Sequence, residues 1–337
     1  MDFITGATGI VGRELVSQLI LAGHRVKALY RNNSDTNTVE GLITSRGLSL
    51  DRLIWVEGEL NDIQSLEASM EGCSRVFHAA ALVSFHPSDE DLLLETNIEG
   101  TKNIVNSMIT QDVNTLVYVS SVAALGRKEN LVVDEETHFE DGVGVTRYSK
   151  SKYLAELEVW RGQEEGLNVA VVNPSIIIGT GDFTRSSAEM FPQIHSGISF
   201  YPSGSSGYVS SSDVAKACVL LADNNVTSER FLLNSENRSY KSLMCETALA
   251  LNVKPPFQVV KPWMSALVWR LFWLIEKLTG KRALATKSSL KMSSLTIEYD
   301  GSKIERVLAL KGVNWEYEPI NEAISRTAKS YLDSISS

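Results

Sequence analysis

Short runs of apolar and β-branched residues alternate, over the first two thirds of the chain, with longer stretches whose apolar residues recur at helical spacing. This alternation is typical of βαβ units and predicts a parallel sheet. The expected strands are residues 2–5, 25–30, 53–57, 75–79, 115–120 and 168–173. Helices are expected most clearly at 10–22, 97–111 and 148–165, and the second of these places Ile98, Thr101, Val105 and Met108 on one face.

Beyond Asn173-Pro174 the pattern changes to segments rich in Gly, Ser and Pro, notably 179–182 and 201–207, which we expect to be loops over a pocket. Helical patterns return at 212–222, 241–251, 264–279 and 320–334. The chain is therefore expected to be an α/β protein, with a Rossmann-type doubly wound parallel sheet and a smaller, mostly helical C-terminal substrate lobe. The expected division is a nucleotide-binding core over 1–178, to which 205–235 returns, and a lobe formed mainly by 179–337.

The segment 263–278 is apolar almost all round and holds three of the six tryptophans. It is too short to span a bilayer, which takes about 20 apolar residues. A buried helix lining the substrate lobe is the favoured interpretation. Weak peripheral contact with a membrane or a tunnel for an apolar substrate are the alternatives.

Composition narrows the function classes. Of 337 residues, 43% are hydrophobic and 22% charged, as in ordinary globular proteins. The net charge of -9 argues against a nucleic-acid binder, which would carry a basic surface. The three cysteines, like the five histidines, lack metal-site spacing, so no metal is expected. Dispersed cysteines and the absence of a basic and apolar leader before the first motif indicate a reducing, cytoplasmic location.

The first strand leads into Thr5-Gly6-Ala7-Thr8-Gly9-Ile10-Val11-Gly12, which has the spacing GxxGxxG and opens a helix. Glycines in such a turn allow a tight bend, close approach of backbone amides to a pyrophosphate, and packing of the helix on the strand. The helix N-terminus then faces the phosphates. Gly6, Thr8, Gly9, Ile10, Val11 and Gly12 are the candidate cofactor residues here.

The end of the second strand sets the preference between the two nicotinamide cofactors. An acidic residue there binds a free ribose 2′-hydroxyl, whereas an arginine accommodates a 2′-phosphate. The sequence has Tyr30-Arg31-Asn32 with no carboxylate at the strand end. NADP(H) is therefore predicted over NAD(H), which remains possible, with Arg31 as the phosphate contact.

Tyr148 and Lys152 are four residues apart at the start of a helical pattern, which places both side chains on one helix face. A free tyrosine has a pKa of about 10, so acid/base work at neutral pH requires a nearby cation such as Lys152. A hydroxyl at the end of a strand completes the constellation. Ser120 and Ser121 end a β-rich run, and we assign Ser121 to the substrate and Ser120 as its neighbour.

In these residues and several further motifs, the chain resembles the extended short-chain dehydrogenase/reductases, also called NAD-dependent epimerase/dehydratases. The matching motifs are Thr5 to Gly12, Gly58-Glu59-Leu60, His78-Ala79-Ala80-Ala81, Asn97-Ile98-Glu99-Gly100-Thr101, Val119-Ser120-Ser121, Tyr148 to Lys152, Asn173-Pro174 and Asp213-Val214-Ala215. They occur in family order over residues 1 to 220. Arg31 and the segment 279–282 favour the dihydroflavonol-reductase and 3β-hydroxysteroid-dehydrogenase branch.

The resemblance implies further cofactor contacts. Glu59, where the family usually has Asp, and Leu60 would lie beside the adenine. Ala79, Ala80 and Ala81 would follow the pyrophosphate and ribose, and Pro174 with Ile177 would lie near the nicotinamide. Asn97, Ser120, Tyr148 and Lys152 complete the set, with Lys152 on the nicotinamide ribose. Many relatives are homodimers that pair the helices near residues 97 and 148, so a homodimer is expected.

The sequence thus predicts an oxidoreductase that reduces a ketone or aldehyde, or oxidises the alcohol, of an apolar small molecule. Hydride would come from the cofactor. Tyr148 would act as the acid/base on the substrate oxygen, and Ser121 would form a hydrogen bond with that oxygen. A nucleotide-sugar epimerase or dehydratase is the alternative. Val122-Ala123-Ala124-Leu125 after Ser121 lacks the additional acid that a dehydratase needs. A nucleotide sensor without catalysis is the third possibility, which fold alone does not exclude.

Overall fold

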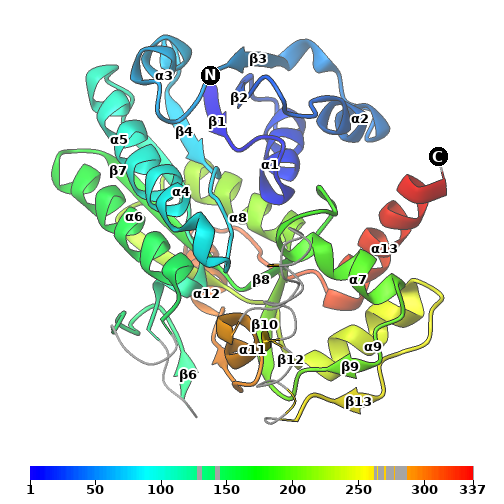
Figure 1. Cartoon of the computed structure of the whole chain (residues 1–337). Helices are drawn as coiled ribbons and strands as arrows, with labels where there is room; N and C mark the ends of the chain where they lie inside the picture. Colours follow the sequence, from blue (N-terminus) through cyan, green and yellow to red (C-terminus); the bar gives the residue numbers. More distant parts are fainter. Residues whose placement is uncertain are drawn as a thin grey trace.

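A seven-stranded parallel sheet forms the centre of the protein in this computed structural model (Figure 1). The structure describes residues 1–126, 131–140, 145–261, 264, 269–270, 277 and 287–336. The strand order is β11-β7-β5-β4-β1-β2-β3, so the sheet is extended outward on both sides of the β1–β4 pair. Strand bounds are β1 Asp2–Thr5, β2 Val26–Tyr30, β3 Leu53–Glu57, β4 Arg75–His78, β5 Thr115–Val119, β7 Asn168–Pro174 and β11 Glu229–Leu233.

Helices cover both faces of this sheet, each over its own hydrophobic core. On one face lie α1 (Ile10–Leu21), α2 (Asn37–Ser45), α8 (Ser211–Asp223) and α12 (Lys303–Leu310). On the other lie α3 (Ile63–Met70), α5 (Gly100–Thr110) and α6 (Arg147–Glu164). Central strands such as β7 are buried on both faces, which explains their nearly continuous Val and Ala content.

The predicted doubly wound sheet is confirmed, and all six predicted strands form within about two residues of their expected ends. The predicted helices at 10–22, 148–165, 212–222, 241–251 and 320–334 form as α1, α6, α8, α9 and α13. The helix expected at 97–111 begins earlier, because α4 (Glu90–Leu93) and a π-helical segment η3 (Leu94–Glu99) lead directly into α5. A π-helical segment often occurs at a functional site.

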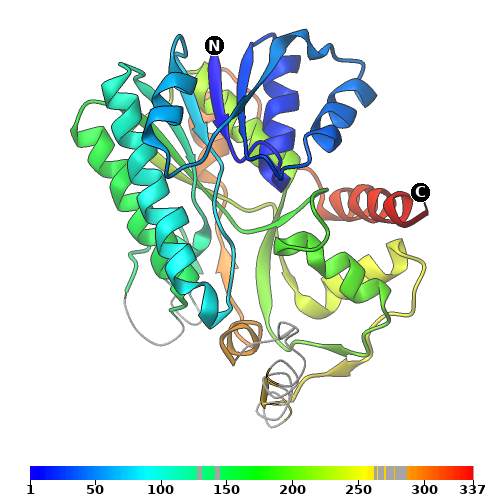
Figure 2. The same ribbon diagram turned by 45° about the horizontal axis from the view of Figure 1, so that its top comes forward.

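The C-terminal lobe contains a second sheet that the sequence analysis did not predict (Figure 2). Its strands are β8 (Ile176–Ile178), β10 (Ser205–Ser210) and β12 (Glu236–Ser239), and its main helices are α7 (Met190–His195), α9 (Tyr240–Ala250) and α13 (Ile320–Ser336). The expected loop at 201–207 is therefore partly wrong. A Cβ on Gly207 would lie 2.1 Å from Asn234 Oδ1, so close packing requires small residues, and these hide the strand pattern.

Smaller elements complete the lobe, namely the pairs β9 (Phe200–Tyr201) with β13 (Gln258–Val259) and β6 (Val132–Val133) with β14 (Glu298–Tyr299), and helix α11 (Lys287–Met292). The expected Trp-rich helix at 263–278 and the segment 279–282 lie outside the described residues, apart from 264, 269–270 and 277. Among the residues that are described, no helix has the length and apolar content to cross a membrane.

Candidate active site

The loop between β1 and α1 owes its shape to two of its three glycines. Gly6 has φ +71°, and a Cβ there would lie 2.6 Å from the Ala80 nitrogen. On Gly12 a Cβ would come within 2.0 Å of the Gly6 carbonyl oxygen. Both positions therefore exclude a side chain, which keeps the loop tight against the end of β4 and helix α1 against the loop.

Gly9 differs, because a Cβ there would make one tight contact where Gly6 and Gly12 would suffer steric overlap. It is exposed, caps α1 with φ -77°, and a Cβ would meet only the Gly6 carbonyl oxygen, at 3.2 Å. A glycine under so little steric pressure, at an exposed helix N-terminus, fits the close approach of a pyrophosphate. The loop thus has the shape that a dinucleotide requires.

The end of β2 opens into a cavity of about 390 Å³ lined by Arg31, Asn32, Asn33 and Glu59. Arg31 is exposed, and its backbone N–H donates to Ser34 Oγ at 3.1 Å, which fixes the turn. The structure therefore brings together two of the predicted cofactor residues, Arg31 and Glu59. Their guanidinium and carboxylate groups lie where the sequence analysis expects the adenosine half of the cofactor.

Ala79, Ala80 and Ala81 follow β4 beside the glycine loop. The Ala79 N–H donates to the Thr5 carbonyl oxygen at 3.2 Å, and the Ala80 N–H donates to Thr5 Oγ1 at 3.3 Å. Because Ala81 is exposed whereas Ala79 and Ala80 are half-buried, the segment emerges from the sheet next to the loop. Two predicted cofactor segments are thus joined through Thr5, by one backbone hydrogen bond and one to its side-chain hydroxyl.

Asn97, another predicted cofactor residue, lies in η3 and is buried, with its amide used by the protein itself. Its Nδ2 donates to the Leu82 carbonyl oxygen at 3.0 Å and to Ser151 Oγ at 2.9 Å, and its Oδ1 accepts the Leu82 N–H at 2.7 Å. Asn97 therefore connects the segment after β4 to helix α6.

Tyr148 lies in the first turn of α6, where a capping box formed by Thr146 and Ser149 fixes the start of the helix. Burial raises the pKa of the Tyr148 phenol, and a side-chain hydrogen bond with Ser121 opposes that rise. The ring of Phe85 meets the Tyr148 ring edge-on, with 5.7 Å between centroids. Tyr148 thus holds its proton at neutral pH and lies beside Ser121.

Lys152 follows one turn later on α6 and is 1% exposed. Its Nζ donates to the Tyr118 hydroxyl oxygen at 2.7 Å and to the Val119 carbonyl oxygen at 3.0 Å. Burial lowers the pKa of Lys152 to about 7, against the opposing charge of Glu156. Burial is the larger cause of the pKa shift at the Tyr148 phenol, and the Lys152 ammonium contacts Tyr118. An effect of Lys152 on the pKa of Tyr148 stays a prediction.

The two serines at the end of β5 have different surroundings. Ser120 is buried, and its Oγ donates to Glu156 Oε2 at 2.6 Å. Asn173 Nδ2 donates to the same oxygen at 2.9 Å, and Arg230 forms an ion pair with Oε1 at 2.5 Å. Ser121 is half-buried and is the serine hydrogen-bonded to Tyr148. The geometry therefore favours Ser121 over Ser120 as the hydroxyl open to a substrate.

The remaining predicted cofactor residues surround the loop at different depths. Thr8 and Ile10 are half-buried in the turn and first helical position, while the Val11 side chain is in the core. Ile10 packs against the segment after β8, because a Cβ on Gly181 would lie 2.5 Å from Ile10 Cγ1. Leu60 lies against Gly100 of α5, Pro174 ends β7, and Ile177 is in β8.

Sequence reasoning missed several residues of this site, all buried polar groups. Tyr118 and His78 lie on central strands, Glu156 lies on α6, and Arg13 on α1 has a buried Nε without a hydrogen-bond partner in the part of the chain that the structure describes. A polar residue in an otherwise apolar strand, or on the packed face of a helix, was the available signal, since buried polar groups need partners. The identity of those partners depends on contacts between distant segments.

Metal chemistry finds no support among the described residues, where no three His, Cys, Asp or Glu side chains come together as possible ligands. The absence of a metal therefore stays a prediction. Cys73, Cys218 and Cys245 are free thiols.

Comparisons with known proteins agree with this arrangement. The profile of the "NAD dependent epimerase/dehydratase family" matches residues 3–233. The chain is 29% identical over 318 residues to a "Putative dihydroflavonol 4-reductase" of Synechocystis sp., covering 91% of this chain and 89% of that protein. It is 29% identical over 255 residues to "Cinnamoyl-CoA reductase CAD2" of Medicago truncatula, covering 72% and 78% of the two chains.

Solved structures share the fold over nearly the whole chain. The crystal structure of gox2253 superposes with a TM-score of 0.81 at 27% identity, covering 99% of this chain and 98% of that one. The Bordetella bronchiseptica enzyme WbmH, solved in complex with NAD+, superposes with a TM-score of 0.74 at 18% identity and covers 98% of each chain. The protein therefore belongs to the NAD-dependent epimerase/dehydratase family of extended short-chain dehydrogenase/reductases, and is a nicotinamide-dependent enzyme of that family.

Proposed function

We propose that the protein reduces a ketone or aldehyde of an apolar small molecule, or oxidises the corresponding alcohol, with NADP(H). The observation that carries this proposal is the hydrogen bond between Tyr148 and Ser121 under the edge of Phe85. It combines a proton donor, a second hydroxyl for the same oxygen, and an apolar wall. Reductase names among the relatives support the same reaction class.

A nicotinamide cofactor bound at the glycine loop would supply the hydride. Tyr148 would give its proton to the carbonyl oxygen, while Ser121 donates a hydrogen bond to that oxygen. The raised pKa of Tyr148 keeps the phenol protonated and suits the reductive direction. Lys152, with a buried ammonium one helical turn away, would bind the nicotinamide ribose.

Preference for NADP(H) over NAD(H) rests on Arg31. It lines the cavity at the end of β2, together with two asparagines and with Glu59, which follows the neighbouring parallel strand β3. A guanidinium can form paired, charge-assisted hydrogen bonds with a 2′-phosphate. NAD bound in a structural neighbour is a property of that protein, and Arg31 is the reason to expect a different preference here.

An apolar substrate is favoured by the segment after β4. Val83 and Phe85 are 38% and 44% exposed, and Phe85 contacts the proposed proton donor directly. A nucleotide sugar would instead need cations for its diphosphate. In the described part of the lobe, Arg185 is paired with Asp182, and Arg238 with Glu236 and Glu246. These pairs argue against the epimerase alternative.

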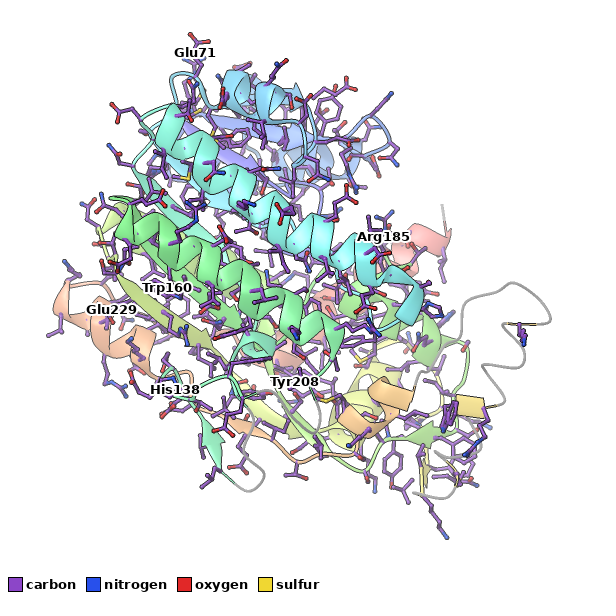
Figure 3. All side chains as sticks on the ribbon, turned by 60° about the vertical axis from the view of Figure 1, so that its left-hand side comes forward. Glu71, His138, Trp160, Arg185, Tyr208 and Glu229 are labelled. Atoms are coloured by element: carbon purple, nitrogen blue, oxygen red, sulfur yellow. The ribbon has the colours of Figure 1, made fainter. Side chains whose placement is uncertain are left out.

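A homodimer through α5 and α6 is part of the proposal. The two helices lie side by side on the outside of the molecule (Figure 3). Leu157 on α6, Ile109 on α5 and Leu94 in η3 are 45%, 39% and 40% exposed. Light scattering at micromolar concentration gives the mass that decides between monomer and dimer. We also retain the reducing, cytoplasmic location and the division near residue 178 as proposals.

The experiment that tests the chemistry compares Tyr148→Phe with Tyr153→Phe. Both remove one hydroxyl from α6, but Tyr153 stacks on Phe139, away from the Ser121 contact, with 4.3 Å between ring centroids. With NADPH and a panel of aromatic ketones and aldehydes, turnover should fall by roughly 10²-fold or more in Tyr148→Phe only. Cofactor affinity should change little in either. Full activity in Tyr148→Phe would mean that the proton comes from another group.

A binding experiment tests the cofactor preference. Arg31→Asp should weaken NADPH binding by at least ~10-fold while sparing NADH, because a carboxylate repels the 2′-phosphate but can accept from a 2′-hydroxyl. Fluorescence titration gives both dissociation constants. Tighter binding of NADH than NADPH by the unmodified protein contradicts the proposal.

A further inference from the structure

A chain of buried hydrogen bonds runs from Lys152 across the sheet to the glycine loop. The Lys152 ammonium donates to the Tyr118 hydroxyl, 2.7 Å away on β5, and the Tyr118 hydroxyl is hydrogen-bonded to Thr101 of α5. His78 Nε2 lies 3.0 Å from Thr101 Oγ1, and His78 Nδ1 lies 2.6 Å from Thr5 Oγ1. All five side chains are buried.

The number of available protons fixes the direction of each hydrogen bond. Thr101 has one hydroxyl proton, which goes to the Asn97 carbonyl oxygen at 2.6 Å, so Thr101 can only accept from its other partners. His78 must therefore carry its proton on Nε2 and accept from Thr5 at Nδ1. Burial, with Lys152 as a second cause, lowers the pKa of His78 to about 3, so this ring stays neutral.

Tyr118 is equally fixed in its protonation state. Burial strongly raises the pKa of its phenol, so the hydroxyl always has a proton to donate and a lone pair for the ammonium. It gives that proton to Thr101, which leaves its oxygen to accept from Lys152. Among contacts within the described chain, two of the three Lys152 protons are used, by Tyr118 and the Val119 carbonyl. One remains for the hydroxyl of a ligand.

We propose that Tyr118 is a positioning residue of the active site, whose hydroxyl holds the Lys152 ammonium at the carboxyl end of β5 and joins it, through Thr101 and His78, to Thr5 at the start of the cofactor loop. This inference rests on the proposed role of Lys152 in cofactor binding. The titratable groups near Lys152 are Tyr118, His78, Glu156 and, one turn earlier on α6, Tyr148. The two tyrosines and His78 stay neutral near pH 7, and Glu156 supplies a negative charge.

The consequence is a pH range over which Lys152 can bind a cofactor. The pKa of Lys152 is about 7. Removal of a hydrogen-bond acceptor of its ammonium therefore reduces the fraction of Lys152 that is charged at neutral pH. Hydrogen bonds to a charged group are strong enough for their loss to lower that pKa by about one unit. In Tyr118→Phe, cofactor affinity should therefore begin to fall at a lower pH than in the unmodified protein.

The test measures the Kd of NADP+ by quenching of tryptophan fluorescence at pH 5.5 and pH 8. At pH 8 the Kd of Tyr118→Phe should be about tenfold higher than that of the unmodified protein. At pH 5.5, where Lys152 is charged in both proteins, the two Kd values should agree within about twofold. Turnover at saturating NADPH should fall less than kcat/KM for the cofactor. Tyr208→Phe is the matched control, because Tyr208, labelled in Figure 3, is fully buried and its hydroxyl has no hydrogen-bond partner among the described residues.

Lys152→Ala separates this inference from the proposed function. Normal NADP+ affinity in Lys152→Ala at both pH values overturns the proposed role of the lysine. If Lys152→Ala binds NADP+ weakly, two results for Tyr118→Phe overturn only the positioning role of Tyr118. One is an affinity like that of the unmodified protein, and the other is an affinity equally weak at both pH values. If Tyr118→Phe does not fold, Thr101→Val carries the test. It removes the acceptor of the Tyr118 proton, so the pH at which cofactor affinity falls should move in the same direction but less far. An unchanged pH dependence in Thr101→Val overturns the inference.

Discussion

Glu156 is the buried charge whose removal should cost the fold most. It is 2% exposed, and its two oxygens accept from Ser120 at 2.6 Å, Asn173 at 2.9 Å and Trp160 at 3.3 Å, and form an ion pair with Arg230 at 2.5 Å. The carboxylate thus joins α6 to β5, β7 and β11. Figure 3 labels Trp160 on α6.

In Glu156→Ala, Arg230 loses its ion-pair partner and Ser120 the acceptor of its hydroxyl proton. Breaking a buried pair costs about 3 to 5 kcal/mol, and we expect the lower end, about 3 kcal/mol, because water can reach the guanidinium. The Arg230 side chain is 25% exposed. Glu156→Gln should cost about 1 to 3 kcal/mol, since the amide oxygen can still accept from Ser120 and Asn173 while the ion pair is lost.

The measurement is urea unfolding without cofactor at pH 7.5, followed by circular dichroism. A loss of about 3 kcal/mol corresponds to a decrease in melting temperature of about 4 °C for a chain of this size. Glu158→Ala, two residues along α6, is the matched control, because Glu158 pairs with Arg161 at the surface and should contribute less than about 1 kcal/mol. Equal stability losses in Glu156→Ala and Glu158→Ala would refute the reasoning. A double variant, Glu156→Leu with Arg230→Met, should recover much of the loss.

Two further predictions concern pH and the cofactor loop. Burial raises the pKa of Asp213 to about 6, above its ordinary 3.8, so the protonated state favours folding below pH 3.8 and this contribution is lost as pH rises through 6. Asp213→Asn should therefore stabilise the protein at pH 8, by at most about 3 kcal/mol, and give no gain at pH 4. A stability difference that is the same at both pH values contradicts this linkage. Gly9→Ala should fold normally and bind NADPH at least ~10-fold more weakly, whereas Gly12→Ala should fail to fold stably, because its Cβ would overlap the Gly6 carbonyl oxygen. Calorimetry with parallel NADPH titrations distinguishes them, and a stable Gly12→Ala would show that the loop can move.

Local patterns in the sequence were sufficient for most of the central sheet. Runs such as Leu116 to Val119 lie in the middle of the molecule, so burial on both faces gives them a continuous apolar signature. The strand β10 has no such signature. Its Ser205-Ser206-Gly207 start is set by the close approach of Asn234, which lies in the chain well after it. Residues that are small because a distant segment packs on them cannot be recognised from their own neighbours.

The candidate site divides in the same way. The spacing of Tyr148 and Lys152 predicts a shared helix face, and helix α6 contains both. The contact between Lys152 and Tyr118 joins residues 34 positions apart, and the contact between His78 and Thr5 spans 73. Sequence alone shows that these polar groups need partners, and only the folded chain identifies them. For that reason the shared helix face of Lys152 and Tyr148 is predictable from their spacing, whereas the hydrogen bond of Lys152 to Tyr118 is not.

The π-helical segment η3 holds more residues per turn than the regular helix α5 that follows it, and this bears on how a change of length there would act. Deleting Ile98 would let the chain continue as a regular α-helix, which is locally the more stable form. Each residue of a helix turns it by about 100°, so the deletion would rotate Asn97 away from Ser151 or Thr101 away from His78. A shorter and more regular helix at this place would therefore preserve the fold and disconnect α6 from the glycine loop.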